Sequence, residues 1–172
     1  ESNLLPEDIT GLVLKDFNGK FDKSLLQTYP NLTNVTIPDG VTSIGYGAFQ
    51  DCTSLTSITI PVSATSIGIW AFYKCTSLTS INIPEGVTSI GETVFEGCSK
   101  LTSVTIQKGV TSIGNKAFLH CSNLTSIDIP SSVTSIGNDS FYGCSSLKTI
   151  NYTGNEEQWN ALSKGYAWNY LC

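Results

Sequence analysis

Six cysteines and one histidine are the side chains of this 172-residue chain best suited to nucleophilic or metal chemistry. Five of the cysteines recur with a constant 23-residue period: Cys52, Cys75, Cys98, Cys121 and Cys144. The histidine, His120, directly precedes Cys121, and a Cys–His pair is a common form of activated thiol nucleophile. Adjacent side chains in a short turn point apart, however, and Cys121 shares its position with four other cysteines. We therefore predict a surface His120 on the convex side and no catalytic pair.

The regular spacing of the cysteines also bears on disulfides and metals. Six cysteines in an extracellular chain normally indicate disulfides, and equivalent positions of stacked strands lie roughly 4.8 Å apart. Their side chains would run parallel, which leaves the Cβ atoms farther apart than the roughly 3.8 Å of a disulfide. A single file of thiols offers no tetrahedral cage for a metal, whereas a buried thiol can hydrogen-bond backbone in a turn. We expect buried free thiols and no metal or cofactor, with Cys172 outside the file.

The remaining titratable groups do not assemble into a recognisable catalytic motif. The 14 acidic residues are scattered, with no pair of carboxylates placed for acid–base work. The sequence contains neither a phosphate-cradling loop nor a serine elbow. We predict that the protein is not an enzyme.

Composition excludes two further classes of partner. Charged residues make up only 13% of the chain, the net charge is −5, and all nine basic residues are Lys. Phosphate recognition and base readout rely heavily on the planar Arg fork, so we expect no nucleic acid. No apolar run approaches the roughly 18 residues that span a bilayer, so we expect no direct membrane insertion. Because the chain contains no Met, we expect Glu1 to follow a processing or excision point.

The cysteine interval belongs to a repeat that extends over most of the chain. Phe, Leu and an Ile-Gly pair recur with the same period, as in Phe72 and Phe95 or Leu78 and Leu101. One unit has the consensus L-x-x-I-x-I-P-x-x-V-T-S-I-G-x-x-A-F-x-x-C-x-x. A single unit cannot bury these apolar residues, whereas stacked units can. The period therefore predicts a solenoid, with residues 1–172 as a single domain.

Each unit predicts two short strands and one tight turn. In L-x-x-I-x-I, alternate residues such as Ile58 and Ile60 share one face, and Pro61 ends the strand because it cannot donate to a ladder. V-T-S-I-G predicts a second extended piece, turned by a Gly with positive φ. A-F-x-x-C suits a single helical or 3-10 turn. The strand spacing and the period are those of leucine-rich repeats, whose units span about 20–29 residues. We expect a curved right-handed leucine-rich-repeat solenoid of the α/β class, mostly β.

The two ends of the repeat depart from the consensus in the manner of caps. Counting back one period from the first regular unit assigns Ile9, Leu12, Phe21, Leu26 and Tyr29 to a degenerate unit over residues 9–31, before regular repeats over 32–151. Residues 152–172 form the C-terminal cap. There Trp159 falls where the Ile of the Ile-Gly pair would be, and Asn155 to Gln158 is typical of a capping box at a helix start.

Over nearly the whole chain this pattern resembles the BspA-like leucine-rich repeats. The unit LTSINIPEGVTSIGETVFEGC, Leu78 to Cys98, is similar to that family's repeat almost letter for letter. The segment YTGNEEQWNALS, Tyr152 to Ser163, is similar to a terminal segment often found there. Such proteins lie mainly on the surfaces of mucosa-dwelling bacteria and some parasitic protists, and members have been linked to adhesion to host matrix and plasma proteins. The resemblance implies an extracellular or cell-surface interaction module, but its motifs are scaffold residues that do not name the ligand.

Repeat proteins usually bind through the concave face, which the outward residues of the first strands would form. The candidate ligand-binding residues on that face are Asn34, Thr36, Ser57, Thr59, Ser80, Asn82, Ser103, Thr105, Ser126, Asp128, Thr149 and Asn151. They are small and polar, without the aromatic and Arg anchors of interface hot spots, so we expect weak or multivalent binding.

Two other surfaces compete with the concave face. The alternative candidate is a convex aromatic patch of Tyr46, Trp70, Tyr73 and Tyr142. The Thr ladders that include Thr56 and Thr111 are a remote alternative that would match an ordered surface such as ice, although Thr also simply favours strands. Among the last aromatics, Tyr166, Trp168 and Tyr170, sealing of the final coil is expected over an oligomer contact.

These observations favour a non-enzymatic, surface-displayed adhesion or interaction module that binds a host or neighbouring-cell protein or a glycan. The second interpretation is a structural spacer within a larger surface protein, with no ligand of its own. A spacer would tolerate charge reversal on every face, whereas an interaction module would lose its partner when one face is changed.

Overall fold

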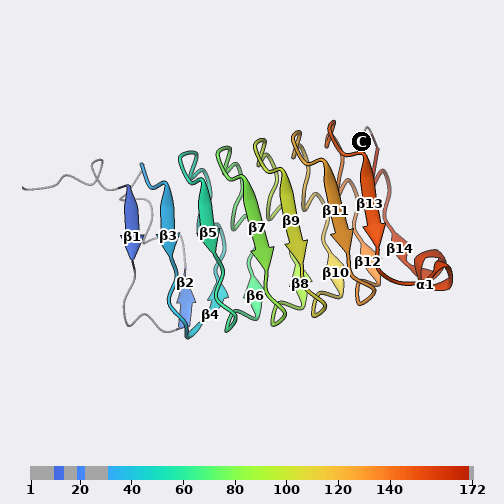
Figure 1. Ribbon diagram of the computed structural model, residues 1–172, viewed down its shortest axis with the longest axis horizontal. Coiled ribbons are helices and arrows are strands. Elements are labelled where there is room, and N and C mark those ends of the chain that lie inside the picture. The colour runs from blue at the N-terminus through green and yellow to red at the C-terminus, as the bar shows by residue number, and fades with distance from the viewer. Residues whose placement is uncertain (1–9, 14–18, 22–30, 171–172) are drawn as a thin grey trace, which may run out of the picture.

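The computed structural model describes residues 10–13, 19–21 and 31–170. These residues wind into a solenoid whose coils stack side by side, with a short helix at the C-terminal end (Figure 1). Two rows of parallel strands run along it. The first row comprises β1 (Gly11–Val13), β3 (Asn34–Thr36), β5 (Ser57–Thr59), β7 (Ser80–Ile83), β9 (Ser103–Ile106), β11 (Ser126–Ile129) and β13 (Thr149–Tyr152). The second comprises β2 (Gly19–Phe21), β4 (Val41–Ile44), β6 (Ser66–Ile67), β8 (Ser89–Ile90), β10 (Ser112–Ile113), β12 (Ser135–Ile136) and β14 (Ser163–Lys164).

The pairing of these strands sets the length of a coil. β7 and β9, for example, pair Ile81 with Val104, one 23-residue period further along the chain. The second row is one sheet of seven strands, whereas the first row divides between β5 and β7 into sheets of three and four. A backbone hydrogen bond of 3.2 Å from Thr79 N–H to the carbonyl oxygen of Thr56 bridges that division. The leucine-rich-repeat solenoid and both predicted strands of each unit are confirmed.

The first coil follows the same offset. β1 places Leu12 beside Val35, and β2 places Phe21 beside Ile44, in the register that counting back gives. Ile9, Leu26 and Tyr29 lie outside the described residues, and the boundaries of the terminal caps stay a prediction.

Turns close the third side of each coil and hydrogen-bond to the next coil. Phe72 N–H donates to the carbonyl oxygen of Val94 at 2.9 Å, and Lys74 N–H donates to that of Glu96 at 2.8 Å. The direction of the peptide groups alternates along this turn, and left-handed φ angles of 61° at Trp70 and 54° at Lys74 accompany the alternation. The predicted helical or 3-10 turn over A-F-x-x-C is therefore wrong. A helical turn would direct its N–H groups back within its own coil and leave this side unlinked.

The glycine of the Ile-Gly pair is required for a different reason than the sequence indicates. In Gly68 and Gly114 the φ angle is not positive, so that prediction is wrong; the left-handed residue comes two positions later, as at Trp70. A Cβ on Gly68 would lie 2.7 Å from the carbonyl carbon of Gly45 in the preceding coil. Because Cβ atoms do not approach backbone so closely, this position takes Gly to let consecutive coils stack.

A stack of phenylalanine rings runs through the centre of the solenoid. Successive ring centroids lie 5.1 Å apart for the first pair and 5.3 Å for the next three, with interplanar angles of 10° or less. The rings are fully buried; they belong to Phe49, Phe72, Phe95, Phe118 and Phe141. The inward Ile and Leu side chains of the two strand rows pack around them, so the core is one continuous column of apolar side chains.

The cysteine thiols form a second ladder beside the rings. The Sγ of Cys98 donates a hydrogen bond of 3.1 Å to the carbonyl oxygen of Phe72 in the preceding coil. The same bond, at 3.1 to 3.2 Å, recurs at Cys75, Cys121 and Cys144. These four thiols are buried, Cys52 is half-buried, and none of the five forms a disulfide. The prediction of buried thiols that hydrogen-bond backbone is confirmed for these four cysteines, and the absence of disulfides is confirmed for all five, while Cys172 lies outside the described residues.

Burial changes the acidity of the thiols. It raises the pKa of Cys98 from an ordinary 9.0 to about 12, against the opposing effect of a hydrogen bond with the backbone of Cys75. Burial, reinforced by the adjacent thiols of the ladder, raises the pKa of Cys75 and Cys121 well above the ordinary value. Since the thiolate is the reactive nucleophile and metal ligand, these groups are chemically inert in the folded protein.

A capped helix ends the solenoid. α1 (Glu156–Ala161) starts at Asn155, whose side chain accepts a hydrogen bond of 2.8 Å from Gln158 N–H. The Gln158 side chain accepts one of 2.9 Å from Asn155 N–H in return. This reciprocal pair is the predicted capping box, which is confirmed.

The register after the helix differs from the prediction. Lys164, not Trp159, pairs with Ile136, because α1 lengthens this coil. The hydrogen bond from Tyr166 N–H to the Asn138 side chain accordingly spans 28 residues, whereas the equivalent bond one coil earlier spans 23 residues.

Trp159 lies on α1 instead. Its carbonyl oxygen accepts a hydrogen bond of 2.7 Å from the Lys164 ammonium, which also lies 4.5 Å from the Trp159 ring centroid. The strand that follows the helix is thereby tied to it.

We predict that Phe95→Ala lowers the free energy of unfolding by about 3–5 kcal/mol, because it opens a cavity between two stacked rings that cannot close over it. Urea denaturation followed by circular dichroism measures the change. Tyr166→Ala is the control, since that side chain is 83% exposed and its loss should change stability by less than about 0.5 kcal/mol. Equal stability of the two variants would contradict the buried ring stack.

We also predict that stability falls as the pH rises above 9. An unfolded thiol ionises near 9.0, whereas folded Cys98 holds its proton to about 12. The folded state therefore binds more protons in this window, and each such thiol lowers the free energy of unfolding by at most about 1.4 kcal/mol per pH unit. Urea midpoints between pH 8 and pH 10.5 measure the slope. Cys98→Ala should make it shallower; an unchanged slope would show that Cys98 does not contribute.

Candidate binding surfaces

The outward side chains of the first strand row form one continuous polar face. Along β7, β9 and β11 exposed and buried residues alternate strictly, so every second side chain is free of the core. All twelve predicted residues are exposed: Asn34, Thr36, Ser57, Thr59, Ser80, Asn82, Ser103, Thr105, Ser126, Asp128, Thr149 and Asn151. We call this set the strand face. The structure brings its members together in register across the coils, as expected.

Hydrogen bonds between coils hold part of the strand face in place. The Asn151 amide donates to the Asp128 carboxylate at 2.8 Å, and the Gln107 amide donates to the Asn82 side-chain oxygen at 3.2 Å. Such bonds order polar groups before any partner arrives, which reduces the entropy lost on binding. None of the twelve residues is aromatic.

The threonine ladders belong to the scaffold. The Thr56 hydroxyl donates to the carbonyl oxygen of Thr33 at 2.9 Å, and the Thr111 hydroxyl to that of Thr88 at 3.0 Å. Further hydroxyls of the two ladders make the same bond to the preceding coil; they belong to Thr79, Thr102 and Thr134. Because these hydroxyl protons are engaged within the protein, they are not available to an ordered external surface.

The four aromatic residues of the alternative site divide into two groups. Trp70 lies between Tyr46 and Tyr73, with ring centroids 5.3 and 6.1 Å away and tilted ring planes. Tyr142 instead packs against His120, with centroids 5.9 Å apart, in later coils. His120 is exposed, as predicted. Only the first group, which we call the Trp70 cluster, gathers aromatic rings around an exposed tryptophan.

A hollow of about 400 Å³ opens beside the Trp70 cluster. Its lining comes from successive coils: Gln50, Trp70, Tyr73, Glu92, Thr93, Glu96 and Lys116. Sequence reasoning identified the two aromatic residues but missed the charged ones. The signal was available, because Glu96 lies one 23-residue period after Tyr73, and Lys116 lies two periods after Trp70.

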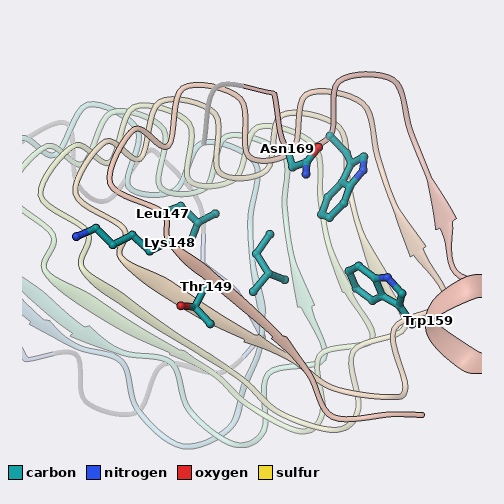
Figure 2. Close-up of a pocket in the computed structure, with 7 residues that line it drawn as sticks. Leu147, Lys148, Thr149, Trp159 and Asn169 are labelled. Atoms are coloured by element: carbon teal, nitrogen blue, oxygen red, sulfur yellow. The ribbon is translucent and has the colours of Figure 1, made fainter. Parts of the chain in front are cut away.

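A second hollow lies at the C-terminal end, where Trp159 and Trp168 take the place of a further coil. Trp168 packs edge-on against Phe141 and Trp159, with ring centroids 6.3 and 6.0 Å away. A cleft of about 370 Å³ remains between these rings and Leu147 and Ile150, while Lys148 extends away from Trp159 (Figure 2). We interpret this cleft as the incompletely covered end of the core.

The three terminal aromatic residues therefore differ in their burial and in the residues they contact. Trp168 covers part of the last ring of the stack, that of Phe141, whereas Tyr166 and Tyr170 are 83% and 60% exposed. Tyr170 stacks on Tyr142 with ring centroids 6.0 Å apart.

The part of the chain that the structure describes contains neither a metal-ligating cluster nor a helix able to span a bilayer. Among residues 10–13, 19–21 and 31–170, no three His, Cys, Asp or Glu side chains gather in a way that would hold a metal ion. In the same part of the chain, no helix has both the length and the apolar composition to cross a bilayer.

Residues 20–148 match the family model described as the BspA type leucine-rich repeat region, in six copies. No curated protein matches the chain. A solved leucine-rich cell surface protein from Faecalibacterium prausnitzii is 42% identical over 76% of this chain and 35% of its own, with a TM-score of 0.74. The present chain thus spans about a third of that protein.

Two further solved structures are similar over almost the whole solenoid. The leucine-rich repeat protein of T. pallidum is 29% identical, with a TM-score of 0.81 over 91% of this chain and 73% of its own. A leucine-rich repeat protein from Bacteroides ovatus is 30% identical, with a TM-score of 0.74 over 94% of this chain and 46% of its own.

Proposed function

The chain belongs to the BspA-type leucine-rich repeat family, and on that premise we propose that it is a surface-displayed, non-enzymatic module that binds a partner protein through the strand face. The partner we favour is a host matrix or plasma protein. Leucine-rich repeats generally serve protein interactions, and the similar F. prausnitzii protein is described as a cell surface protein.

The observation that carries this proposal is that the core constrains the inward residues of each first-row strand but not the outward ones. The inward residues, such as Ile81 and Ile83, are fixed as aliphatic by the core. The outward residues make no core contact, and the second outward position varies between Thr, Asn and Asp from coil to coil. An array of side chains whose identity the core does not dictate is the usual place for recognition in repeat proteins.

The chemistry of the strand face supports weak contacts that many copies reinforce. It contains hydroxyl and amide groups and one carboxylate, that of Asp128, and it lacks the aromatic and Arg anchors of high-affinity interfaces. Display of many copies on a surface converts such contacts into strong overall attachment.

A structural spacer is the second candidate. In favour of it, the Thr ladders, the ring stack and the thiol ladder all serve coil-to-coil cohesion. The two functions differ in one measurable property, since a spacer has no face whose alteration abolishes binding.

We predict that charging the strand face abolishes capture of the partner. Ser80→Lys with Ser103→Glu, and Asn82→Glu with Thr105→Lys, place opposite charges side by side in the β7–β9 register. Thr105→Lys also sets its ammonium opposite the Asp128 carboxylate of β11, so the four changes add no repulsion within the sheet. The wild-type domain, displayed on beads, is screened against purified matrix and plasma proteins. The fourfold variant should weaken the binding of the captured protein at least about tenfold, equivalent to about 1.4 kcal/mol.

The matched control places Ser66→Glu and Ser89→Lys in the second strand row, on β6 and β8, and should bind like the wild type. Loss of binding in the control as well would point to a general charge effect rather than to the strand face. Absence of capture by the wild-type beads at about 50 μM partner, well above the Kd of a weak specific interface, would favour the spacer.

A further inference from the structure

Trp70 occupies a backbone position that does not favour it. Its φ of 61° is left-handed, a conformation that is uncommon for bulky residues and strained in them. Equivalent positions in neighbouring coils have the same left-handed backbone and hold Gly47, Thr93, Lys116 and Asp139. The scaffold therefore accepts small or polar residues here and does not require tryptophan. Strained aromatic residues at exposed positions point to a role outside folding.

The Trp70 cluster presents this indole as a supported platform. Trp70 is 38% exposed, and Tyr46 and Tyr73 pack against it from the neighbouring coil and from its own. The contacts restrict the ring without covering it. An aromatic ring held in this way can bury the apolar face of a ligand at little cost in side-chain entropy.

The hollow beside the platform is lined by hydrogen-bonding groups of both kinds. The exposed carboxylate of Glu92 and the half-buried one of Glu96 are acceptors, and the exposed Lys116 ammonium is a donor. Two rows of residues at 23-residue intervals, 50–73–96 and 70–93–116, run along the solenoid through the hollow. Each row spans two coil spacings, roughly 10 Å in total.

The charges around the hollow give a cationic ligand no advantage. The Lys74 ammonium lies 5.1 Å from the Tyr73 ring centroid, so a cation of this chain already occupies that cation–π position. Lys116 in the lining and Lys74 over the Tyr73 ring match in number the two carboxylates of Glu92 and Glu96, so no excess of negative charge attracts a cation. A neutral ligand with many hydroxyl groups satisfies acceptors and donors together without burying an unpaired charge.

We propose that the hollow beside Trp70 is a carbohydrate-binding site for a short neutral oligosaccharide, with one pyranose ring stacked on the Trp70 indole. Hydroxyl groups of the sugar donate hydrogen bonds to Glu92 and Glu96 and accept one from Lys116. A hollow of about 400 Å³ lies within the ordinary range of ligand pockets. This site lies on the turn side of the coils, apart from the strand face, and does not depend on the function proposed for that face.

The test is titration calorimetry of the whole domain with cellotetraose, maltotetraose, chitotetraose and a di-N-acetyllactosamine tetrasaccharide, each to about 10 mM, tenfold above a Kd of about 1 mM. At least one should bind saturably, with little dependence on salt. Trp70→Gly should weaken it at least about tenfold, because it removes the platform while Gly adopts the left-handed backbone without strain. Tyr166→Ala, which removes another exposed aromatic side chain, should bind like the wild type.

A second variant keeps the platform intact. Glu92→Lys extends a longer, positively charged side chain into the hollow from an exposed position and should also abolish binding of the sugar. The proposal is overturned if none of the four sugars binds, or if binding survives both Trp70→Gly and Glu92→Lys. It is also overturned if a Lys-rich peptide, titrated in parallel, binds in a Trp70-dependent manner while the sugars do not. The fourfold strand-face variant should retain sugar binding, so the two proposals are tested independently of each other.

Discussion

Hydrogen bonding from each coil to the next is the constraint on which the rest of the structure depends. On the two strand sides the backbone of one coil pairs with its neighbour as a parallel sheet, and on the third side alternate turn N–H groups donate to the following coil. Pairing on all three sides holds the interior coils to one length, whereas α1 lengthens the last coil, which has a neighbour on one flank only. The fixed length of the interior coils, the glycine at which coils approach most closely, and the left-handed turn residues all follow from this pairing.

Side chains extend the same axial pairing beyond the backbone. The thiol of Cys98 reaches the Phe72 carbonyl, the Thr56 hydroxyl reaches that of Thr33, and the Asn115 side chain accepts a bond from Asn138 N–H. The Phe72 and Thr33 carbonyl oxygens also accept backbone N–H groups, so the thiol and the hydroxyl each add a second hydrogen bond to them, whereas the Asn115 side chain pairs a backbone N–H. The reactive-looking cysteines are explained in this way, since their position provides a hydrogen bond to the core and a neutral thiol rather than a nucleophile.

Periodicity revealed the features that recur, and it failed where the repeat is broken or where the reason for a residue is three-dimensional. Alternation in L-x-x-I-x-I fixed the inward Ile81 and the outward Asn82, and the Asn155–Gln158 pair identified the capping box. The turn conformation was misjudged because Phe and Cys three residues apart suit both a helical turn and this turn. The position of Lys164 in the second strand row was not predicted, because α1 lengthens the last coil and the repeat spacing does not indicate by how much. The hollow beside Trp70 combines non-repeating residues from several coils, so no single unit displays it.

The equivalence of the coil junctions has an evolutionary consequence. Because each interior junction uses the same hydrogen bonds and the same ring-on-ring contact, duplication or deletion of a whole repeat unit regenerates a junction of the kind already present. Length can therefore change by unequal recombination between the repeated codons without redesign of the core. A hollow lined by several consecutive coils does not share this tolerance, since a unit inserted after Tyr73 would carry Glu92 and Lys116 away from Trp70. Selection for such a hollow would preserve the order of the units that line it, rather than the total number of units.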